Sequence, residues 1–145
     1  MNNIEFVFEE VKKFVFKSNI LRENIFFLIK NEGRTAGNIV VIFCHDKYLL
    51  DLNNQFLQHD FFTDILTFDY SEHMELSGDL FISIDRVREN AANYNKFFLE
   101  ELYRVVIHGV LHLAGYSDQS DEEKLIMRKK ENFYLDRINF KEKKE

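Results

Sequence analysis

Among the 145 residues there is no proline and only one cysteine, Cys44. A single cysteine excludes a disulfide within the chain and fits a reducing compartment. Cys44 ends a compact apolar run at residues 39–44. We therefore expect it to be an inert, buried strand residue and not a nucleophile. The lack of proline supports no functional argument.

The sequence also lacks a long apolar run and a basic N-terminal region. Apolar stretches such as residues 25–29 are far shorter than the roughly 20 residues that a helix needs to cross a bilayer. The first residues carry no cluster of positive charge, which argues against a signal peptide. We therefore expect a cytoplasmic protein that does not enter a membrane.

Positive charge is in short supply, because 19 lysines and arginines stand against 25 aspartates and glutamates, a formal net charge of −6. A protein that binds nucleic acid regardless of sequence needs cations to neutralise phosphates. The composition counts against such a general binder, although a locally basic face is still allowed. Basic residues cluster within residues 12–22, 86–88 and 128–130, where solvated helix faces are the simpler interpretation.

Apolar side chains, in contrast, are plentiful. Hydrophobic residues make up 46% of the chain and aromatic residues 15%, most of them phenylalanine. A chain of this length can bury one proper core but is too short to divide comfortably into two. We therefore expect a single domain over residues 1–145.

Apolar periodicity predicts a single α/β (α+β) domain with a mixed sheet of about four strands and helices packed on it. The expected strands lie at residues 4–8, 39–44, 65–68 and 79–84. The expected helices cover residues 19–33, 46–57, 99–114 and 121–139, with a further one beginning at residue 85. Asn19 and Asp85 are predicted N-caps, and residues 120–123 form a capping box that opens the last helix. The helix at 99–114 is nearly all apolar in its second half, so we expect it at the centre of the fold.

Two histidines on this central helix are the first candidates for chemistry. His108 and His112 are four residues apart, so their rings project from the same helix face and can bind one ion. Arg104 lies on the same stripe. A histidine pair at this spacing is more often a packing or surface feature, but an otherwise apolar helix would bury unpartnered imidazoles at a cost.

A third ligand is expected after the helix ends. Gly115 stops the helix, so the chain can fold back and bring Asp118 toward the histidines. Two nitrogens and one oxygen leave a fourth position open, which is typical of catalytic rather than structural zinc sites. Asp118 could instead be a turn residue before the next helix, and Asp121 is a competing ligand.

An ordinary zinc protease does not fit this pattern. Such enzymes carry a glutamate directly after the first histidine, where it acts as the general base. Here that position is Gly109. The sequence therefore argues against the protease interpretation.

Three ordered blocks resemble those of the YbeY family of rRNA-maturation endoribonucleases. Residues 108–116 read His-Gly-Val-Leu-His-Leu-Ala-Gly-Tyr, similar to the family signature His-Gly-x-Leu-His-Leu-x-Gly-Tyr-Asp-His. Leu52-Asn53 with residues 63–68, and residues 78–83, resemble its Leu-Asn … Thr-Asp/Asn-Val-Leu-Ser-Phe and Gly-Asp-Ile-x-Ile-Ser blocks. The likeness covers the chain from about residue 44 to the last helix, whereas the first forty residues match only in general pattern.

The resemblance implies a metal-dependent, single-strand-selective endoribonuclease that acts in ribosomal RNA maturation and small-subunit quality control. Ribosomal RNA and the small ribosomal subunit would be its partners, and one divalent ion, with zinc as first choice, its cofactor. Such an ion can polarise a phosphoryl oxygen and lower the pKa of its water toward neutrality. No catalytic side chain is assigned beyond that water. Candidate substrate-binding residues are Thr63, Asp64, Asp79, Arg86 and Arg104.

The sequence departs from the family pattern at two positions. Asp118 stands where the family has its third histidine, which leaves the metal preference open. Leu57 stands where the family commonly has an arginine implicated in RNA handling, and Arg86, Arg88 or Arg104 could replace it. Two other functions therefore stay open: a ribosome-assembly factor that binds RNA or protein around a structural metal, and a metal hydrolase with a substrate other than RNA.

Overall fold

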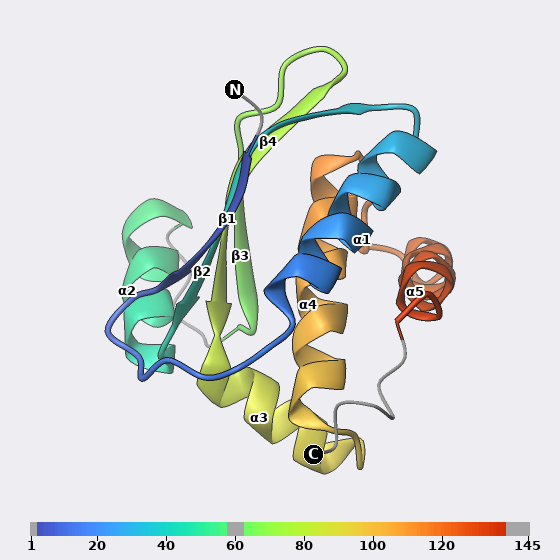
Figure 1. The fold of residues 1–145 in the computed structure, drawn as a ribbon. Coiled ribbons are helices and arrows are strands. Elements are labelled where there is room, and N and C mark those ends of the chain that lie inside the picture. Colours follow the sequence, from blue (N-terminus) through green and yellow to red (C-terminus); the bar gives the residue numbers. More distant parts are fainter. Residues whose placement is uncertain (1–2, 58–62, 139–145) are drawn as a thin grey trace.

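The computed structural model describes residues 3–57 and 63–138 and contains a mixed four-stranded sheet (Figure 1). The strands are β1 (Asn3–Phe8), β2 (Thr35–Cys44), β3 (Ile65–Asp69) and β4 (Glu75–Ser83), in the order β1-β2-β4-β3. The first three strands in this order are parallel, and β3 pairs with β4 in the antiparallel sense at one edge. The sheet is therefore parallel from β1 to β4 and ends in the antiparallel hairpin of β3 and β4.

Five helices in the described part of the chain cover this sheet. They are α1 (Ser18–Asn31), α2 (Asp46–Leu57), α3 (Ile84–Asn93), α4 (Phe98–Leu113) and α5 (Asp121–Leu135). Helix α2 packs on one face of the sheet and α1 and α4 on the other, while α5 lies on the outer side of α4 (Figure 1). The predicted α/β domain with the histidine helix at its centre is confirmed.

Helix α4 is central because its sequence is apolar on almost every side. Ten of its residues are buried, among them Leu102, Val106 and Val110. Glycines on both surfaces, Gly109 of α4 and Gly78 of β4, let the helix approach the sheet closely. A side chain on Gly109 would collide with Ile65 of β3 and Leu80 of β4. The helix is thereby held close to β3, which brings its histidines to the edge of the sheet.

Alanine at Gly78 is expected to destabilise the fold by about 1–3 kcal/mol, because the core there has no room for a methyl group. A Cβ at this position would lie 2.6 Å from the Phe68 carbonyl oxygen and 2.8 Å from a Leu113 methyl carbon. The carbonyl belongs to the neighbouring strand and cannot move away as a flexible side chain does. Urea denaturation measures the effect as a lower midpoint, and an unchanged midpoint would show that Leu113 and β3 yield without cost.

Several boundaries differ from those predicted from the sequence. The N-cap of α3 is Ser83, whose hydroxyl accepts a hydrogen bond from the Arg86 amide, and the predicted cap Asp85 lies inside the first turn. Helix α1 begins at Ser18 without a side-chain cap, so Asn19 is also helical, and its side chain accepts a hydrogen bond from Arg22. In both helices the N-cap therefore lies two residues before the predicted one. Strands β2 and β4 begin before their apolar runs, at Thr35 and Glu75.

Other local predictions are confirmed. Ser120 and Glu123 form the reciprocal capping box at the start of α5, and Gly115 follows α4 with a positive φ of 104°. The predicted end of α5 at residue 139 lies outside the described residues. Cys44 is fully buried in β2, and burial raises the pKa of its thiol to about 12, as expected for an inert residue. No helix in the described ranges has the length and apolar character needed to span a bilayer.

Candidate metal centre

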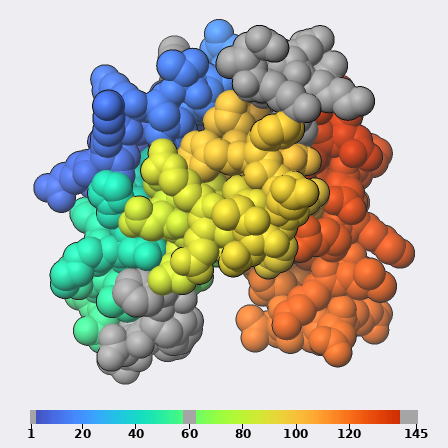
Figure 2. Space-filling model, turned by 90° about the horizontal axis from the view of Figure 1, so that it is seen from below, coloured from blue at the N-terminus to red at the C-terminus, as the bar shows by residue number. Residues whose placement is uncertain are grey.

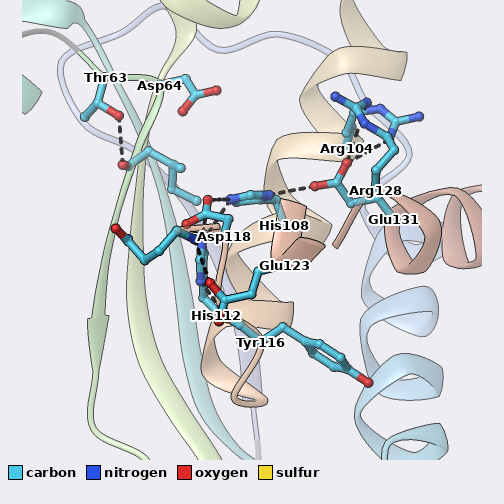
Figure 3. Close-up of polar contacts among 12 residues, drawn as sticks. Thr63, Asp64, Arg104, His108, His112, Tyr116, Asp118, Glu123, Arg128 and Glu131 are labelled. Carbon is cyan, nitrogen blue, oxygen red and sulfur yellow. Dashed lines mark hydrogen bonds and ion pairs between the residues drawn. The ribbon is translucent and has the colours of Figure 1, made fainter. Parts of the chain in front are cut away.

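His108, His112 and Asp118 converge on one point at the C-terminal half of α4 (Figure 3). The Nε2 atoms of the two histidines are 2.9 Å apart. One Asp118 carboxylate oxygen, Oδ2, lies 3.1 Å from the His108 Nε2 and 3.4 Å from the His112 Nε2. The three side chains are partly buried, with exposed fractions of 22%, 27% and 32%. Two nitrogens and one oxygen thus face one small space that solvent can reach.

The turn after α4 brings Asp118 to the histidines. Gly115 adopts the left-handed conformation that glycine accepts readily, and its amide donates to the His112 carbonyl, 3.0 Å away. The Tyr116 amide donates to the Leu111 carbonyl at 3.1 Å, while the Arg34 guanidinium donates to the carbonyl of Ala114 at 3.2 Å. These bonds satisfy the last carbonyls of the helix and fix the path of the chain toward Asp118.

The outer nitrogens of both rings are hydrogen-bonded, and this sets their tautomers. The His112 Nδ1 lies 2.9 Å from the carbonyl oxygen of Tyr116, which can only accept, so Nδ1 carries the proton. The His108 Nδ1 lies 2.6 Å from a carboxylate oxygen of Glu131 and donates in the same way. In the neutral rings both Nε2 lone pairs therefore point into the shared space. Two lone pairs 2.9 Å apart repel unless a cation lies between them, so the donor set fits a zinc-class ion.

Glu131 of α5, which the sequence analysis did not single out, links the metal centre to Arg104. It is only 4% exposed, and its second carboxylate oxygen accepts a hydrogen bond from the Arg104 guanidinium at 2.8 Å. Burial is the largest influence on the pKa of Glu131 and raises it, but hydrogen bonds and charges from His108 and Arg104 outweigh burial and lower the pKa. Glu131 is therefore a buried anion that holds the His108 ring in place.

A pattern in the sequence could have identified Glu131. It lies on the apolar stripe of α5 formed by Met127, Tyr134 and Leu135, at helical spacing. A carboxylate on a buried stripe needs a partner, and the partner had to come from another element. Which residue the partner is could not be predicted from the sequence of α5 alone.

The pKa of His108 is raised from its ordinary value. Burial is the largest single influence and lowers this pKa. The hydrogen bond and charge of Glu131, together with the charges of Asp118 and Asp64, raise the pKa by more than burial lowers it. The pocket around His108 is therefore strongly anionic, which favours a bound cation at this position.

Hydrogen bonds of the Tyr116 side chain hold the backbone of this residue in place. The Tyr116 hydroxyl donates to Glu32 at 2.6 Å, and Lys130 donates to the other oxygen of Glu32 at 3.1 Å. Tyr134 also hydrogen-bonds to Glu32. Since the Tyr116 carbonyl holds His112, this polar cluster between α1 and α5 supports the metal centre from behind.

Two hollows meet at His108 and Asp118, and His112 lines the second of them. The first, here named the α5 cavity, has a volume of about 330 Å³ and lies between α3, α4 and α5; the second, the β3 cavity, has about 500 Å³ and runs along β3. Asp64, His108 and Asp118 line both. Figure 2 shows a notch in the surface beside the orange segment that leads into α5, below the yellow-green part that includes α3.

The predicted substrate-binding residues fall in different places. Thr63 and Asp64 line the β3 cavity next to the histidines, and burial raises the pKa of Asp64 although the charge of His108 opposes it. Arg104 lines the α5 cavity. Arg86 does not line either cavity and pairs with Asp46 of α2. Asp79 is also away from both, where its carboxylate accepts a hydrogen bond from Tyr70.

Strand parity explains the position of Asp79. Its neighbours Gly78 and Leu80 point toward α4, where they contact Leu113 and the surroundings of Gly109. Side chains alternate along a strand, so Asp79 points to the opposite face of the sheet. A carboxylate on that face cannot reach a site built on α4.

The remaining candidates lie apart from the three converging residues. Asp121 is exposed at the first position of α5 and is not one of the cluster. His45 pairs with Asp85 at 3.2 Å, and His73 is an exposed residue of the turn between β3 and β4. His59 lies outside the described residues. Of the two alternatives for the third ligand, Asp118 is therefore the one within reach.

Comparison with known proteins agrees with this geometry. The family model "Endoribonuclease YbeY" matches residues 3–139. The chain belongs to the YbeY family. An Endoribonuclease YbeY of Flavobacterium psychrophilum is 50% identical over 79% of this chain and 82% of its own length. The Endoribonuclease YbeY of Karelsulcia muelleri is 48% identical over 77% of this chain and 79% of its own length.

A solved structure supports the fold as well. The solution structure of a Thermotoga maritima protein has a TM-score of 0.63 and 32% identity, and the match covers 92% of this chain and 87% of the other. The YbeY family model also extends over the first forty residues, where the sequence motifs gave only a general likeness. The family's relatives are named as endoribonucleases, so the prediction of a hydrolase is confirmed.

Proposed function

We propose that this protein is a metal-dependent, single-strand-selective endoribonuclease that acts in ribosomal RNA maturation and in quality control of the small ribosomal subunit. The observation that carries the proposal is the meeting of two imidazole nitrogens and one carboxylate oxygen at the junction of two surface hollows. Relatives with about half of their aligned residues identical are named for endoribonuclease activity. We propose the cytoplasm as its location and the ribosomal RNA of the small subunit as its partner.

His108, His112 and Asp118 would hold one divalent ion, for which we propose zinc. Zinc accepts this mixture of nitrogen and oxygen donors in tetrahedral geometry. When bound, such an ion supplies Lewis acidity toward a phosphoryl oxygen and an acidified water. The set of three donors favours this catalytic role over a purely structural site, because structural zinc sites usually have four protein ligands.

The other residues act on this site through position and charge. Glu131 holds the His108 ring with Nε2 facing inward, and the Tyr116 carbonyl does the same for His112. Asp64 borders both hollows beside His108, and we propose that it, together with Thr63, contacts the ribose or base next to the cut phosphate. Arg104 supports Glu131 and so acts through the ring of His108.

The proposal predicts that the purified protein cuts single-stranded RNA at least tenfold faster than the same sequence in a duplex. A chelator should stop the reaction, and zinc should restore it. The measurement is the cleavage rate of a labelled ribosomal RNA fragment, single-stranded or annealed, at equal concentration. Protein mutated at His112 and purified identically controls for contaminating nuclease. Cleavage that survives chelation, or equals that of the mutated protein, would contradict the proposal.

A further inference from the structure

Among the described residues, lysines and arginines around the metal centre lie on one wall. Among the described residues that line the β3 cavity there is no lysine or arginine, and Leu57 is one of them. The α5 cavity, in contrast, is lined by Arg104, Lys124 and Arg128. Four carboxylates, Asp64, Glu101, Asp118 and Glu131, line it as well, and Glu131 is already paired with Arg104 and His108. A polyanion that reaches the histidines can therefore be neutralised from the α5 side, and not by the described part of the β3 side.

The three cations on this wall differ in how far they are already paired. The Arg104 side chain is 14% exposed, and its guanidinium donates at 2.8 Å to both Glu131 and Asn132. Lys124 is exposed, and within the described ranges its ammonium group has no side-chain partner. Arg128 is 57% exposed and approaches Glu131 only to 3.7 Å. Lys124 and Arg128 are four residues apart on α5, so both can present their charge to one phosphate group or to two adjacent ones.

An exposed aromatic ring completes the cavity. Tyr94, at the C-terminal end of α3, is 61% exposed and lines the α5 cavity opposite α5. Asn90, one helical turn earlier, lines the same cavity and offers an amide. An uncovered ring beside a cationic wall is the combination with which proteins bind single-stranded nucleic acid: bases stack on the ring and phosphates pair with the cations.

We propose that the α5 cavity binds the nucleotide next to the cut phosphate, with its base stacked on Tyr94 and its phosphate held by Lys124 and Arg128. The volume of about 330 Å³ is at the lower end of the range for small-molecule sites, which suits one nucleotide rather than a duplex. A base within a duplex is already stacked and paired, so this subsite selects single strands. The inference rests on the proposed endoribonuclease function and names the residues that recognise its substrate.

The test measures binding of the zinc-loaded protein to a short single-stranded oligodeoxynucleotide, which keeps phosphates and bases but lacks the ribose hydroxyl. Fluorescence anisotropy is recorded over a series of salt concentrations. Each phosphate contact to a single strand contributes about 0.7 to the slope of log affinity against log salt. Lys124→Ala should therefore lower the slope by about 0.7 and weaken binding about fivefold at 0.1 M salt. Lys129→Ala removes the same charge from the outer face of α5 and should change both values much less.

The aromatic contact is tested separately. Tyr94→Ala should weaken binding roughly tenfold without changing the salt slope, whereas Tyr94→Phe keeps the ring and should bind like the wild type. Arg128→Ala should act like Lys124→Ala, but its neighbour Glu131 makes Lys124 the cleaner position. Equal behaviour of Lys124→Ala and Lys129→Ala would overturn the phosphate contact. Equal loss in both Tyr94 variants would overturn the stacking.

Cleavage kinetics separate this inference from the proposed function. If both hold, Lys124→Ala and Tyr94→Ala raise KM for single-stranded RNA while zinc content stays complete. RNA cleavage with an unchanged KM in these variants would overturn the subsite and leave the proposed function intact. Binding that depends on Lys124 and Tyr94 without any cleavage would support the subsite and overturn the endoribonuclease. A wild-type protein that binds no single strand overturns the subsite.

Discussion

Alanine at His112 or at Asp118 is expected to weaken zinc binding by more than about 100-fold and to reduce RNA cleavage to the level of the chelated protein. Loss of a residue that merely orients a metal ligand already costs roughly 10–100-fold in affinity, and loss of a ligand costs more. His112 supplies one of two converging nitrogens, and Asp118 the carboxylate oxygen at 3.1 Å from the His108 Nε2. Zinc affinity is measured by competition with a chromogenic chelator, beside the cleavage rate.

Each variant has a matched control in the same chain. His45→Ala removes an exposed histidine that pairs with Asp85, and Asp121→Ala removes the aspartate that competes with Asp118 as third ligand in the sequence. Both should bind zinc and cut RNA as the wild type does. Full zinc occupancy in Asp118→Ala would show that this residue only shapes the turn, and loss of zinc in Asp121→Ala would move the third ligand there.

The central part of this site could be predicted because it depends on local rules. The spacing of His108 and His112 places both rings on one helix face wherever the helix packs. Gly115 then ends the helix, and a reversal of the chain within a few residues can only return to the same helix end. Asp118 therefore comes within reach of the pair by chain geometry alone. The apolar character of α4 fixed its central place in the same way.

Residues that depend on tertiary packing could not be assigned in this manner. Glu131 follows His108 by 23 residues and meets it only because α5 folds back along α4. Asp64 and Asp79 look equivalent in the sequence, since each lies at a strand start within a polar segment. They differ because α4 covers one face of the sheet and Asp79 points to the other.

The predicted helix caps were wrong for a related reason. Asp85 is a good N-cap by composition, but Ser83 lies at the end of β4, where the chain already turns into α3. Asp85 is used differently: its carboxylate accepts a hydrogen bond from the Asp46 amide at the start of α2. A residue type that suits a cap is equally suited to bind a neighbouring helix end, and only the packing of the two helices decides.

Replacing Glu131 by glutamine is expected to destabilise the protein by roughly 3 kcal/mol and to weaken zinc binding about 10–100-fold. The amide has the size of the carboxylate, but it offers one acceptor oxygen and an NH₂ donor, so it cannot accept from both His108 and Arg104. Arg104, whose side chain is 14% exposed, then loses its anion, and the His108 ring loses the charge that fixes its tautomer. Urea denaturation of the zinc-free protein and zinc competition measure the two effects independently.

The pH dependence gives this prediction a second readout. The pKa of Glu131 is lowered in the folded state from its ordinary value of 4.5. Its contribution to stability is therefore complete above pH 4.5 and is lost as the pH falls through the lower folded-state pKa. The difference in unfolding free energy between the wild type and Glu131→Gln should shrink below pH 4.5. Glu122→Gln, the same change on the exposed face of α5, should stay within about 0.5 kcal/mol of the wild type at every pH. If Glu131→Gln is equally harmless, the Arg104–Glu131–His108 chain does not hold the metal centre, and the position of His108 must come from the packing of α4 alone.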